Sequence, residues 1–521
     1  METEVKSPPE RFNFARHIFD VNRSRPDKTA YIDDREAISY AELELRARRF
    51  AAGLLEQGLR PEERVLLVMH DTADMPVAML GAMFAGIVPV PVNTLLPMED
   101  YAYMLAHSGA RAVVVSAPLA DCIGQALAHS GSRARMIVSS DIDALPEGAK
   151  NFHALLQASP LPEDGNADTH RNAFAFWLYS SGSTGKPKGT VHTHANLYWT
   201  ATLYGQPVLG VREDDVVFSA AKLFFAYGLG NAFTFPLSVG ATTVLMAERP
   251  TPQAVFQRLV RHKPTVFAGV PTLYVSMLAS NDLPARADTA LRICASAGEM
   301  LPREVGERFK SHFGADILDG IGSTEMLHIF LSNRSGDIRY GTTGRPVEGY
   351  DVALRDEEGK TVPTGEVGDL YIRGPSAALM YWTNREKSQA TFQGEWLKSG
   401  DKYLKDRDGY YTYAGRSDDM LKVSGQYVSP VEVESALVEH PAVLECAVVG
   451  RPDADGLVKT MAYVVLRNNQ QGDDELRAEL KSFVKSRLTP HKYPREFVFV
   501  PDLPKTATGK IQRFKLRAIG Q

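Results

Sequence analysis

Three cysteines are few for a chain of 521 residues, and Cys122, Cys294 and Cys446 lie far apart without a C-x-x-C pair. This spacing excludes a disulfide framework and a zinc site built on paired cysteines, and it suits the reducing cytosol. An excess of positive charge is also missing. The formal net charge of -5 gives no electrostatic basis for nucleic-acid binding. We therefore expect a cytoplasmic protein without a nucleic-acid partner.

Hydrophobic runs are short, and the one that approaches a membrane span is interrupted. Residues 75–92 are eighteen positions without a charge, the lower limit for a transmembrane helix. Pro76, Pro89 and Pro91 interrupt this run, together with two glycines. We predict a helix over residues 79–85, a turn at Gly86 and a strand over residues 87–90. The polar, charged N-terminus gives no sign of a signal peptide, so no membrane partner is expected.

Helix and strand patterns alternate through the first four hundred residues. An amphipathic helix is predicted over residues 40–57. Buried strands are predicted over residues 64–69, 112–115, 135–138, 265–270 and 291–295. This alternation is typical of α/β proteins with parallel sheets.

From about Gly344 the predicted strands are shorter and turns more frequent, which indicates a β-rich subdomain. The Asp-Gly pair at residues 408–409 predicts a hairpin turn. The last hundred residues form a compact unit with helices predicted over 430–439 and 474–487 and strands over 445–449 and 461–466. We predict a multi-domain α/β protein with a large domain over residues 1–417 and a small, mobile α+β domain over residues 418–521.

A glycine-rich segment, residues 180–189, contains three glycines, three serines, a threonine and two lysines. Small side chains, exposed N–H groups and positive charge are what a loop needs to wrap a polyphosphate. It is not a Walker A loop, because Pro187 follows Lys186 where Ser or Thr would hold magnesium. A flexible linker is the alternative interpretation. The strand predicted over residues 174–179 and the apolar return at residues 189–191 favour a phosphate-binding hairpin.

Further motifs follow in order along the chain. They are Asp-Gly-Ile-Gly-Ser-Thr-Glu at 319–325, Ser-Gly-Asp at 399–401, Gly-Arg-Ser-Asp-Asp-Met-Leu-Lys-Val-Ser-Gly at 415–425 and Pro-Lys-Thr-Ala-Thr-Gly-Lys-Ile at 504–511. Together with the glycine loop, they closely resemble the acyl-adenylate-forming (ANL) superfamily. The segments 224–230 and 325–330 look like its benzoate-CoA ligase branch.

This resemblance implies an ATP-dependent acid–thiol ligase. A carboxylate would attack the α-phosphate of ATP to give an acyl-AMP and pyrophosphate, and the coenzyme A thiol would then displace AMP. Two anions meet in the first step, so cations and N–H dipoles must offset their repulsion. The implied substrates are benzoate, ATP and coenzyme A, with Mg²⁺ as cofactor and aromatic degradation as the setting.

The resemblance also assigns residues. Lys510, Thr324 and Glu325 would be catalytic, with Glu325 also holding Mg²⁺. The residues expected to bind ATP are Ser181, Gly182, Ser183, Thr184, Gly185, Lys188, Gly298, Asp319, Gly320, Ile321, Gly322, Thr324, Asp401 and Arg416. The residues expected to bind the acid are Ala226, Tyr227, Gly228, Ala297, Gly298, His328, Ile329 and Lys510. Asp418 matches the family's hinge, and Gly425 matches the glycine of its coenzyme A tunnel.

One position departs from the family pattern: Ile321 stands where an aromatic residue usually flanks adenine. Aromatic residues such as Phe224 and Tyr227 suit a flat aromatic acid, although such residues are also common in protein cores. His192 and His194 are expected to share a face of a strand. With no third ligand close in sequence, we interpret them as structural.

Several alternatives stay open. The chain could load an aryl acid onto a carrier protein, or act on 2-aminobenzoate or hydroxybenzoate instead of benzoate. A non-catalytic nucleotide-binding regulator on the same fold is the alternative outside enzymes. The sequence also leaves a homodimer open.

Overall fold

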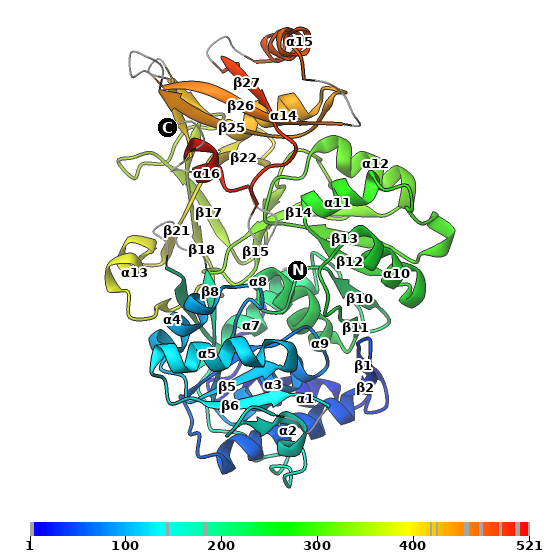
Figure 1. Cartoon of the computed structure of the whole chain (residues 1–521), viewed down its shortest axis with the longest axis vertical. Helices are drawn as coiled ribbons and strands as arrows, with labels where there is room; N and C mark the ends of the chain where they lie inside the picture. The colour runs from blue at the N-terminus through cyan, green and yellow to red at the C-terminus, as the bar shows by residue number, and fades with distance from the viewer. Residues whose placement is uncertain are drawn as a thin grey trace.

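The computed structural model describes residues 5–141, 145–180, 186–416, 419–423, 426–452, 458–467, 472–488, 492–505 and 511–518. Figure 1 shows the first α/β layer at the bottom, a second sheet and a β-rich part in the middle, and the C-terminal part at the top. This architecture confirms the predicted mixed α/β class, with parallel sheets, a β-rich part and a separate C-terminal unit.

The first sheet is parallel, with strand order β4-β3-β5-β6-β7. Its strands are β3 (Arg64–Val68), β4 (Val88–Pro91), β5 (Ala112–Ser116), β6 (Arg135–Ser139) and β7 (Lys150–Asn151). The helices of this layer are α2 (Tyr40–Glu56), α3 (Asp74–Phe84), α4 (Met98–Ser108), η1 (Ala117–Leu119), α5 (Ala120–Ser130) and α6 (Phe152–Leu155). The helix predicted over residues 40–57 and the three strands predicted for this region are confirmed.

Helix α3 is longer than predicted. It begins at Asp74 rather than residue 79, and all its residues are buried. Pro76 lies in the first turn, where the missing N–H of proline costs no helical hydrogen bond. The segment is therefore a core helix followed by strand β4. None of the helices in the described part of the chain is long and apolar enough to cross a membrane.

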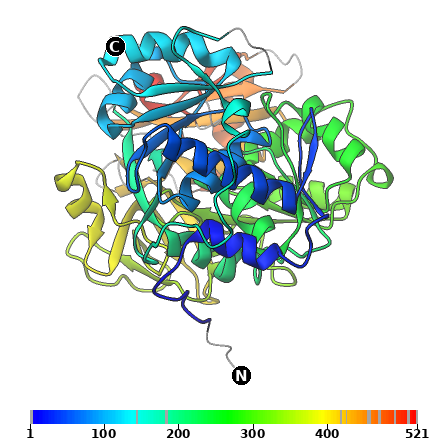
Figure 2. The same ribbon diagram turned by 90° about the horizontal axis from the view of Figure 1, so that it is seen from below.

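The second sheet includes nine described strands in the order β16-β15-β14-β13-β12-β10-β11-β1-β2, of which the run from β14 to β1 is parallel. The strands are β1 (Thr29–Ile32), β2 (Ala37–Ser39), β10 (Val216–Ser219), β11 (Thr242–Val244), β12 (Val266–Gly269), β13 (Ile293–Ser296), β14 (Asp316–Gly322), β15 (Ile329–Ser332) and β16 (Arg345–Pro346). The helices around it are α1 (Phe14–Asn22), α7 (His194–Thr200), η2 (Ala201–Gly205), α8 (Ala226–Leu229), η3 (Gly230–Thr234), α9 (Phe235–Val239), α10 (Pro252–His262), α11 (Pro271–Leu278), η4 (Arg286–Asp288) and α12 (Arg303–Phe313). Figure 2 shows the N-terminal helices, in blue, crossing the end of the molecule seen from below.

The glycine loop connects the two strands of an antiparallel hairpin, as predicted. Strand β8 (Phe174–Ser180) pairs with β9 (Lys188–Thr193), and Ser180 lies opposite Lys188. A third strand, β19 (Met380–Tyr381), pairs with the other side of β9. The expectation that His192 and His194 share a strand face is wrong, because His194 begins helix α7. Thr193 caps this helix and ends the strand.

The β-rich part is an antiparallel sheet with the path β17-β18-β21-β20, and β22 pairs with β21. Its elements are β17 (Asp351–Arg355), β18 (Val367–Arg373), α13 (Arg385–Thr391), β20 (Phe392–Gln393), β21 (Trp396–Lys405) and β22 (Tyr411–Arg416). The Asp-Gly turn predicted at residues 408–409 connects β21 and β22 and is confirmed.

The C-terminal unit has its own core. Its elements are β23 (Leu421–Val423), β24 (Gln426–Val428), α14 (Pro430–Val438), β25 (Val443–Pro452), β26 (Val458–Leu466), α15 (Asp474–Lys485), β27 (Glu496–Phe499) and α16 (Arg513–Ala518). Buried residues of α14, β25, β26 and α15, including Leu437, Val448, Val464 and Leu480, pack together. The predicted hinge Asp418 and tunnel residue Gly425 lie outside the described residues, so the domain boundary stays a prediction.

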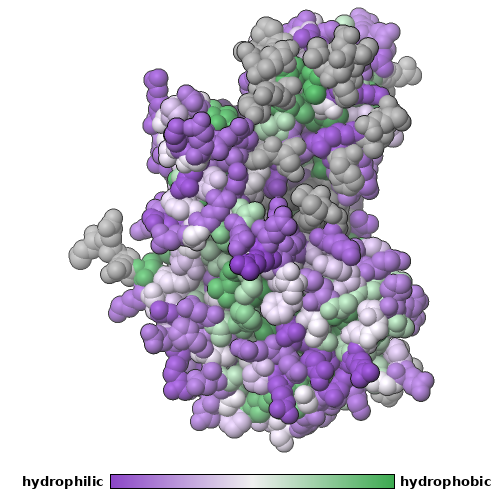
Figure 3. Space-filling view, turned by 90° about the vertical axis from the view of Figure 1, so that its left-hand side faces the viewer, coloured by the Kyte–Doolittle hydropathy of each residue, from purple (hydrophilic) through white to green (hydrophobic). Residues whose placement is uncertain are grey.

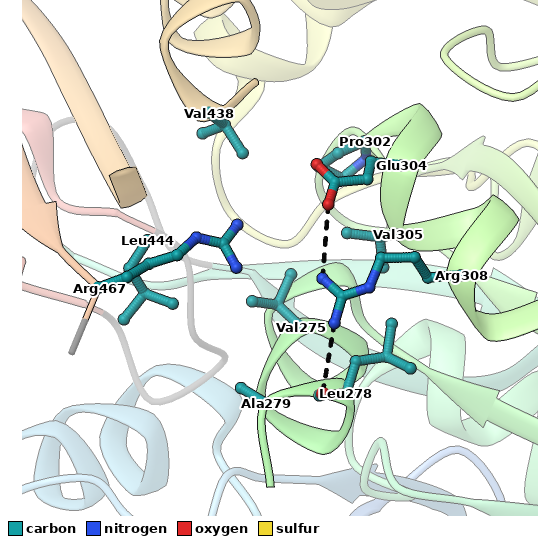
Figure 4. Close-up of a pocket in the computed structure, with 10 residues that line it drawn as sticks. All are labelled: Val275, Leu278, Ala279, Pro302, Glu304, Val305, Arg308, Val438, Leu444 and Arg467. Carbon is teal, nitrogen blue, oxygen red and sulfur yellow. Dashed lines mark hydrogen bonds and ion pairs between the residues drawn. The ribbon is translucent and has the colours of Figure 1, made fainter. Parts of the chain in front are cut away.

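The C-terminal unit faces helices α11 and α12 of the larger part. In Figure 4, Val438, Leu444 and Arg467 from the C-terminal unit line a small cavity opposite residues of these helices. A larger groove of about 1210 Å³ also lies between the two parts. Its walls carry both acidic and basic side chains, among them Glu304, Lys402, Glu432 and Lys492.

The surface seen in Figure 3 is mostly hydrophilic, with hydrophobic residues in several separate areas. Among the described residues, the large apolar side chains with substantial exposure are Val5, Leu55, Leu95, Val260, Val367 and Leu379. They come from separate parts of the chain, and single exposed apolar residues are normal on protein surfaces.

Candidate active site

Lys188 is described, and it is one of the residues predicted to bind ATP. It begins strand β9, directly after the loop, and its ammonium nitrogen lies 4.3 Å from the centre of the Tyr381 ring. Partial burial lowers the pKa of Lys188, and the negative charge of Glu325 opposes this shift. The other predicted loop residues, Ser181, Gly182, Ser183, Thr184 and Gly185, lie outside the described residues.

The Thr-Glu turn follows β14 and is held from three sides. The His192 ring nitrogen Nε2 lies 2.8 Å from the Thr324 carbonyl oxygen. The backbone N–H of Ala378 donates to the Glu325 carbonyl oxygen over 2.7 Å. The Glu325 side chain accepts a hydrogen bond of 2.7 Å from the Tyr381 hydroxyl at Oε1. Glu325 and Lys188 are 137 positions apart in sequence, and both side chains contact Tyr381.

The glycines of the motif at 319–325 have a packing role. A Cβ on Gly320 would lie 2.8 Å from the Leu331 carbonyl oxygen, and one on Gly322 would lie 2.5 Å from the His328 carbonyl oxygen. Both glycines therefore allow β14 to pair closely with β15. Ile321 lies between them and packs against the core.

Asp319 is a buried carboxyl at the start of this motif. Burial raises its pKa to about 8, and its Oδ1 has no hydrogen-bond partner among the described residues. An unpartnered buried oxygen of this kind is costly unless a ligand or water reaches it.

Asp401 and Arg416 lie opposite each other on β21 and β22. The Arg416 nitrogen Nη1 is 3.3 Å from Asp401 Oδ1. Asp401 is buried, whereas Arg416 is exposed. The charge of Arg416 also lowers the pKa of Lys188, which places this pair near Lys188. The antiparallel sheet therefore brings a carboxylate and a guanidinium to the edge of the predicted ATP site.

The predicted acid-binding residues meet beside β15. The rings of Tyr227 and His328 stack with centres 5.7 Å apart, and Phe235 meets His328 edge-on at 4.5 Å. His328 and Ile329 are buried, and Ala226 and Gly228 flank Tyr227 on helix α8. Burial lowers the pKa of His328 to about 3, so this wall is aromatic and uncharged at neutral pH.

Two glycines set the spacing of this wall. A Cβ on Gly228 would lie 2.1 Å from the Lys222 carbonyl oxygen, and one on Gly230 would lie 2.2 Å from the His328 ring. Ala297 and Gly298 follow strand β13. Ala297 is buried in the same cluster as Ile329, and Gly298 has a φ of 96°, which a glycine adopts without strain.

Comparison with known proteins decides the family. Residues 18–382 match the sequence model described as AMP-binding enzyme, and residues 432–510 match that of the AMP-binding enzyme C-terminal domain. The chain belongs to the AMP-binding enzyme family. It is 56% identical over 514 residues to the benzoate–CoA ligase of Thauera aromatica, covering 98% of this chain and 96% of that protein.

Two solved structures resemble this AMP-binding enzyme over nearly its whole length. The benzoate CoA ligase from Burkholderia xenovorans LB400 has a TM-score of 0.92 and 64% identity, covering 97% of this chain and 100% of that one. An anthranilate CoA ligase in complex with anthranoyl-AMP has a TM-score of 0.93 and 41% identity, covering 98% of both chains. The ANL resemblance is thereby confirmed.

Glu325 fits a magnesium ion held mainly by phosphates. Mg²⁺ commonly takes one or two protein carboxylates and completes its shell with phosphate oxygens and water. The described residues of this AMP-binding enzyme contain no group of three or more His, Cys, Asp or Glu placed to hold a metal ion. The described residues therefore offer a single carboxylate, Glu325, close to Lys188.

No motif in the sequence indicates Tyr381 or the role of His192. Tyr381 lies in an apolar run that carries no pattern of its own, and only the pairing of β19 with β9 brings it to Glu325 and Lys188. The sequence indicates only a structural role for His192. The structure shows that the His192 ring contacts the Thr324 carbonyl oxygen. Lys510 lies outside the described residues, and its catalytic role remains a prediction.

Proposed function

We propose that this AMP-binding enzyme joins benzoate to coenzyme A through a benzoyl-AMP intermediate and releases AMP and pyrophosphate. The observation that carries the proposal is the position of Lys188 and Glu325 around Tyr381, in the same fold as the aromatic wall of Tyr227 and His328. The relatives named above act on benzoate or anthranilate, which supports an aromatic acid as substrate.

In the first step, a benzoate oxygen attacks the α-phosphorus of ATP, and the bond to the bridging oxygen of the β-phosphate breaks. Pyrophosphate leaves with the negative charge. The glycine loop and Lys188 hold the departing phosphates, and the Thr324 side chain donates to the α-phosphate. We assign Lys510 the role of the cation that offsets the repulsion between the two reacting anions. Glu325 would hold Mg²⁺, which would supply further positive charge to the phosphates.

We assign the recognition of the ribose and adenine of ATP to residues of β14, β21 and β22 and to Gly298 after β13. Asp401 accepts hydrogen bonds from the ribose hydroxyls, because a carboxylate has acceptor positions for both. Arg416, which faces Asp401 at 3.3 Å, assists at the ribose or phosphate. Gly298 and the segment Asp319–Gly322 lie around adenine, with Ile321 giving apolar contact in place of an aromatic ring.

In the second step, the coenzyme A sulfur attacks the benzoyl carbon, and the bond from that carbon to the AMP phosphate oxygen breaks. The thiol proton is lost to solvent, and AMP leaves. We assign Asp418 as the hinge about which the C-terminal unit, residues 418–521, turns between the two steps. Gly425 then leaves room for the pantetheine arm, where a side chain would obstruct the thiol.

The acid is expected to be neutral apart from its reacting carboxylate. His328 is uncharged at neutral pH because burial lowers its pKa, and Tyr227 is a neutral phenol. This wall therefore offers no cation to a second carboxylate. A flat benzene ring matches the stacked rings of Tyr227 and His328.

The surroundings of the enzyme are also part of the proposal. We place it in the cytoplasm, where its three free cysteines stay reduced, and in the degradation of aromatic compounds. A homodimer is testable by light scattering of the purified protein.

A substrate panel tests this function. Benzoate, 2-aminobenzoate, 4-hydroxybenzoate, cyclohexane carboxylate and a medium-chain fatty acid would each be incubated with ATP, Mg²⁺ and coenzyme A. We expect stoichiometric AMP and acyl-CoA with benzoate, and the highest kcat/KM for it. A higher kcat/KM for 2-aminobenzoate or 4-hydroxybenzoate would overturn the benzoate assignment. AMP formation that requires a carrier protein would favour the loading function instead.

A further inference from the structure

Tyr381 connects two groups that come from separate parts of the proposed active site. Its hydroxyl donates to Glu325 Oε1 over 2.7 Å, and the face of its ring lies 4.3 Å from the Lys188 ammonium nitrogen. Lys188 follows the glycine loop and Glu325 ends the Thr-Glu turn, whereas Tyr381 comes from β19. One side chain from a third segment thus contacts both.

The hydrogen bond fixes one oxygen of Glu325. A carboxylate only accepts hydrogen bonds, and a phenol is a neutral donor at neutral pH, so the direction of the bond is determined. Hydrogen bonds to a charged acceptor are stronger than those between neutral groups. With Oε1 held by Tyr381, the rotation of the Glu325 carboxylate is restricted, and Oε2 is left for a cation.

The ring contact orients Lys188. Among the described residues, no carboxylate lies within ion-pairing distance of the Lys188 ammonium group. The ammonium group instead contacts the face of the Tyr381 ring, which carries a negative potential. A carboxylate partner would neutralise the lysine, whereas a ring attracts the ammonium and leaves its charge available for phosphate.

The backbone around Tyr381 is firmly placed. Tyr381 lies opposite Thr190 in the pairing of β19 with β9, and the N–H of Trp382 donates to the Gly189 carbonyl over 2.7 Å. The N–H of Tyr381 donates to Ser388 Oγ over 2.9 Å. The residue is only 3% exposed, so its ring has little freedom to move.

We propose that Tyr381 is a positioning residue that aligns the magnesium carboxylate Glu325 and the phosphate lysine Lys188 as a unit. The proposal rests on the function proposed above and extends it to a residue that acts through Glu325 and Lys188. Its hydroxyl acts on Glu325 and its ring acts on Lys188, so the two contributions are separable by substitution.

The test uses Tyr381→Phe and Tyr381→Leu in the full-length protein, with ATP binding measured by calorimetry in Mg²⁺ and in EDTA. Phenylalanine keeps the ring and removes the hydroxyl. We expect Tyr381→Phe to weaken ATP binding about tenfold in Mg²⁺ and to change it less than twofold in EDTA. Tyr381→Leu removes both contacts and is expected to weaken binding in both conditions.

Tyr40→Phe is the matched control, because it removes another buried tyrosine hydroxyl, which donates to the Ala241 carbonyl over 2.6 Å. It should bind ATP like the wild type in both conditions. Thermal unfolding of each variant verifies folding. A merely structural role of Tyr381 would weaken binding equally with and without Mg²⁺, and that result would overturn the proposal. Wild-type binding by Tyr381→Phe in Mg²⁺ would overturn it as well.

The outcome is separable from the proposed function. If the wild type forms benzoyl-CoA but Tyr381→Phe binds ATP normally in Mg²⁺, the positioning role alone is wrong. If Tyr381→Phe loses Mg²⁺-dependent ATP binding but no acid in the panel is activated, the benzoate function alone is wrong.

Discussion

Gly230 shows, at the scale of one residue, how closely the aromatic wall is packed. Its added Cβ would lie 2.2 Å from the His328 ring, which Tyr227 and Phe235 hold in place. Overpacking of this kind costs about 1–3 kcal/mol. We expect Gly230→Ala to raise the benzoate concentration for half-maximal activity about tenfold or more, with little change for ATP.

Steady-state kinetics with each substrate varied in turn measure this effect. Gly124→Ala is the control, because it lies in helix α5 and the nearest atom to its added Cβ is 3.7 Å away. An unchanged benzoate dependence in Gly230→Ala would contradict the placement of His328 beside the acid.

His194 gives a pH dependence of stability. Burial lowers its pKa to about 3, and its Nδ1 accepts a hydrogen bond from the Phe14 N–H over 3.2 Å. The folded protein holds this ring neutral, while the unfolded chain binds a proton below pH 6.5. The contribution of His194 to the free energy of unfolding is therefore complete above pH 6.5. It is lost as the pH falls, and the free energy of unfolding is lower by about 2 kcal/mol at pH 5.

His194→Asn keeps an acceptor for Phe14 but does not titrate. We expect its melting temperature to fall less between pH 7 and pH 5 than that of the wild type. Equal falls in both proteins, measured by calorimetry, would show that His194 is not held neutral in the fold.

At the scale of elements, the loop before α8 depends on a contact from the first sheet. Asp71 follows β3 and is buried, and its two carboxylate oxygens accept from the Leu223 N–H over 3.3 and 3.1 Å. Leu223 immediately precedes Phe224 and Phe225, so the first layer positions the loop that leads to the aromatic wall.

Removing this acceptor leaves the Leu223 N–H buried without a partner, which costs about 1–3 kcal/mol. We expect Asp71→Ala to weaken benzoate binding more than ATP binding and to lower the melting temperature. Asp71→Asn keeps an oxygen acceptor and should be milder in both measurements. If the two variants were equally impaired, the negative charge rather than the hydrogen bond would matter.

The elements themselves were largely predictable, and their long-range contacts were not. Residues 64–69 and 112–115 are strands because their apolar runs are bounded by turns, which is a local property. The pairing of β19 with β9 joins residues almost two hundred positions apart, so no local pattern points to Tyr381. Pro76 makes the sequence predict too late a start for α3, whereas the first turn of a helix accepts proline.

For the whole molecule, the central prediction is that Lys510 serves the first step and not the second. Lys510→Ala should lower benzoate-dependent pyrophosphate exchange by about two to three orders of magnitude, as expected for loss of one transition-state cation. Conversion of supplied benzoyl-AMP to benzoyl-CoA should change far less. Equal losses in both half-reactions would mean that Lys510 does not distinguish them.

The sequence predicts those residues of the proposed active site that belong to sequence motifs. Asp401, Arg416, Glu325 and Lys188 each stand in a motif. Asp401 lies within β21, opposite Arg416 at the end of β22. Glu325 follows the end of β14, and Lys188 begins β9. The glycines of the 319–325 motif were expected to bind nucleotide, and the structure shows that they admit the backbone of β15. That packing role depends on a strand pair which the motif alone does not reveal.

ATP–pyrophosphate exchange by the purified wild-type protein tests the proposed activation of benzoate most directly. The assay contains benzoate and Mg²⁺ and no coenzyme A. Exchange reports reversible formation of benzoyl-AMP, the intermediate on which every assigned role depends. We predict rapid exchange that requires benzoate and stops when benzoate is replaced by a fatty acid. Absence of benzoate-dependent exchange from a folded, ATP-binding protein would contradict the account.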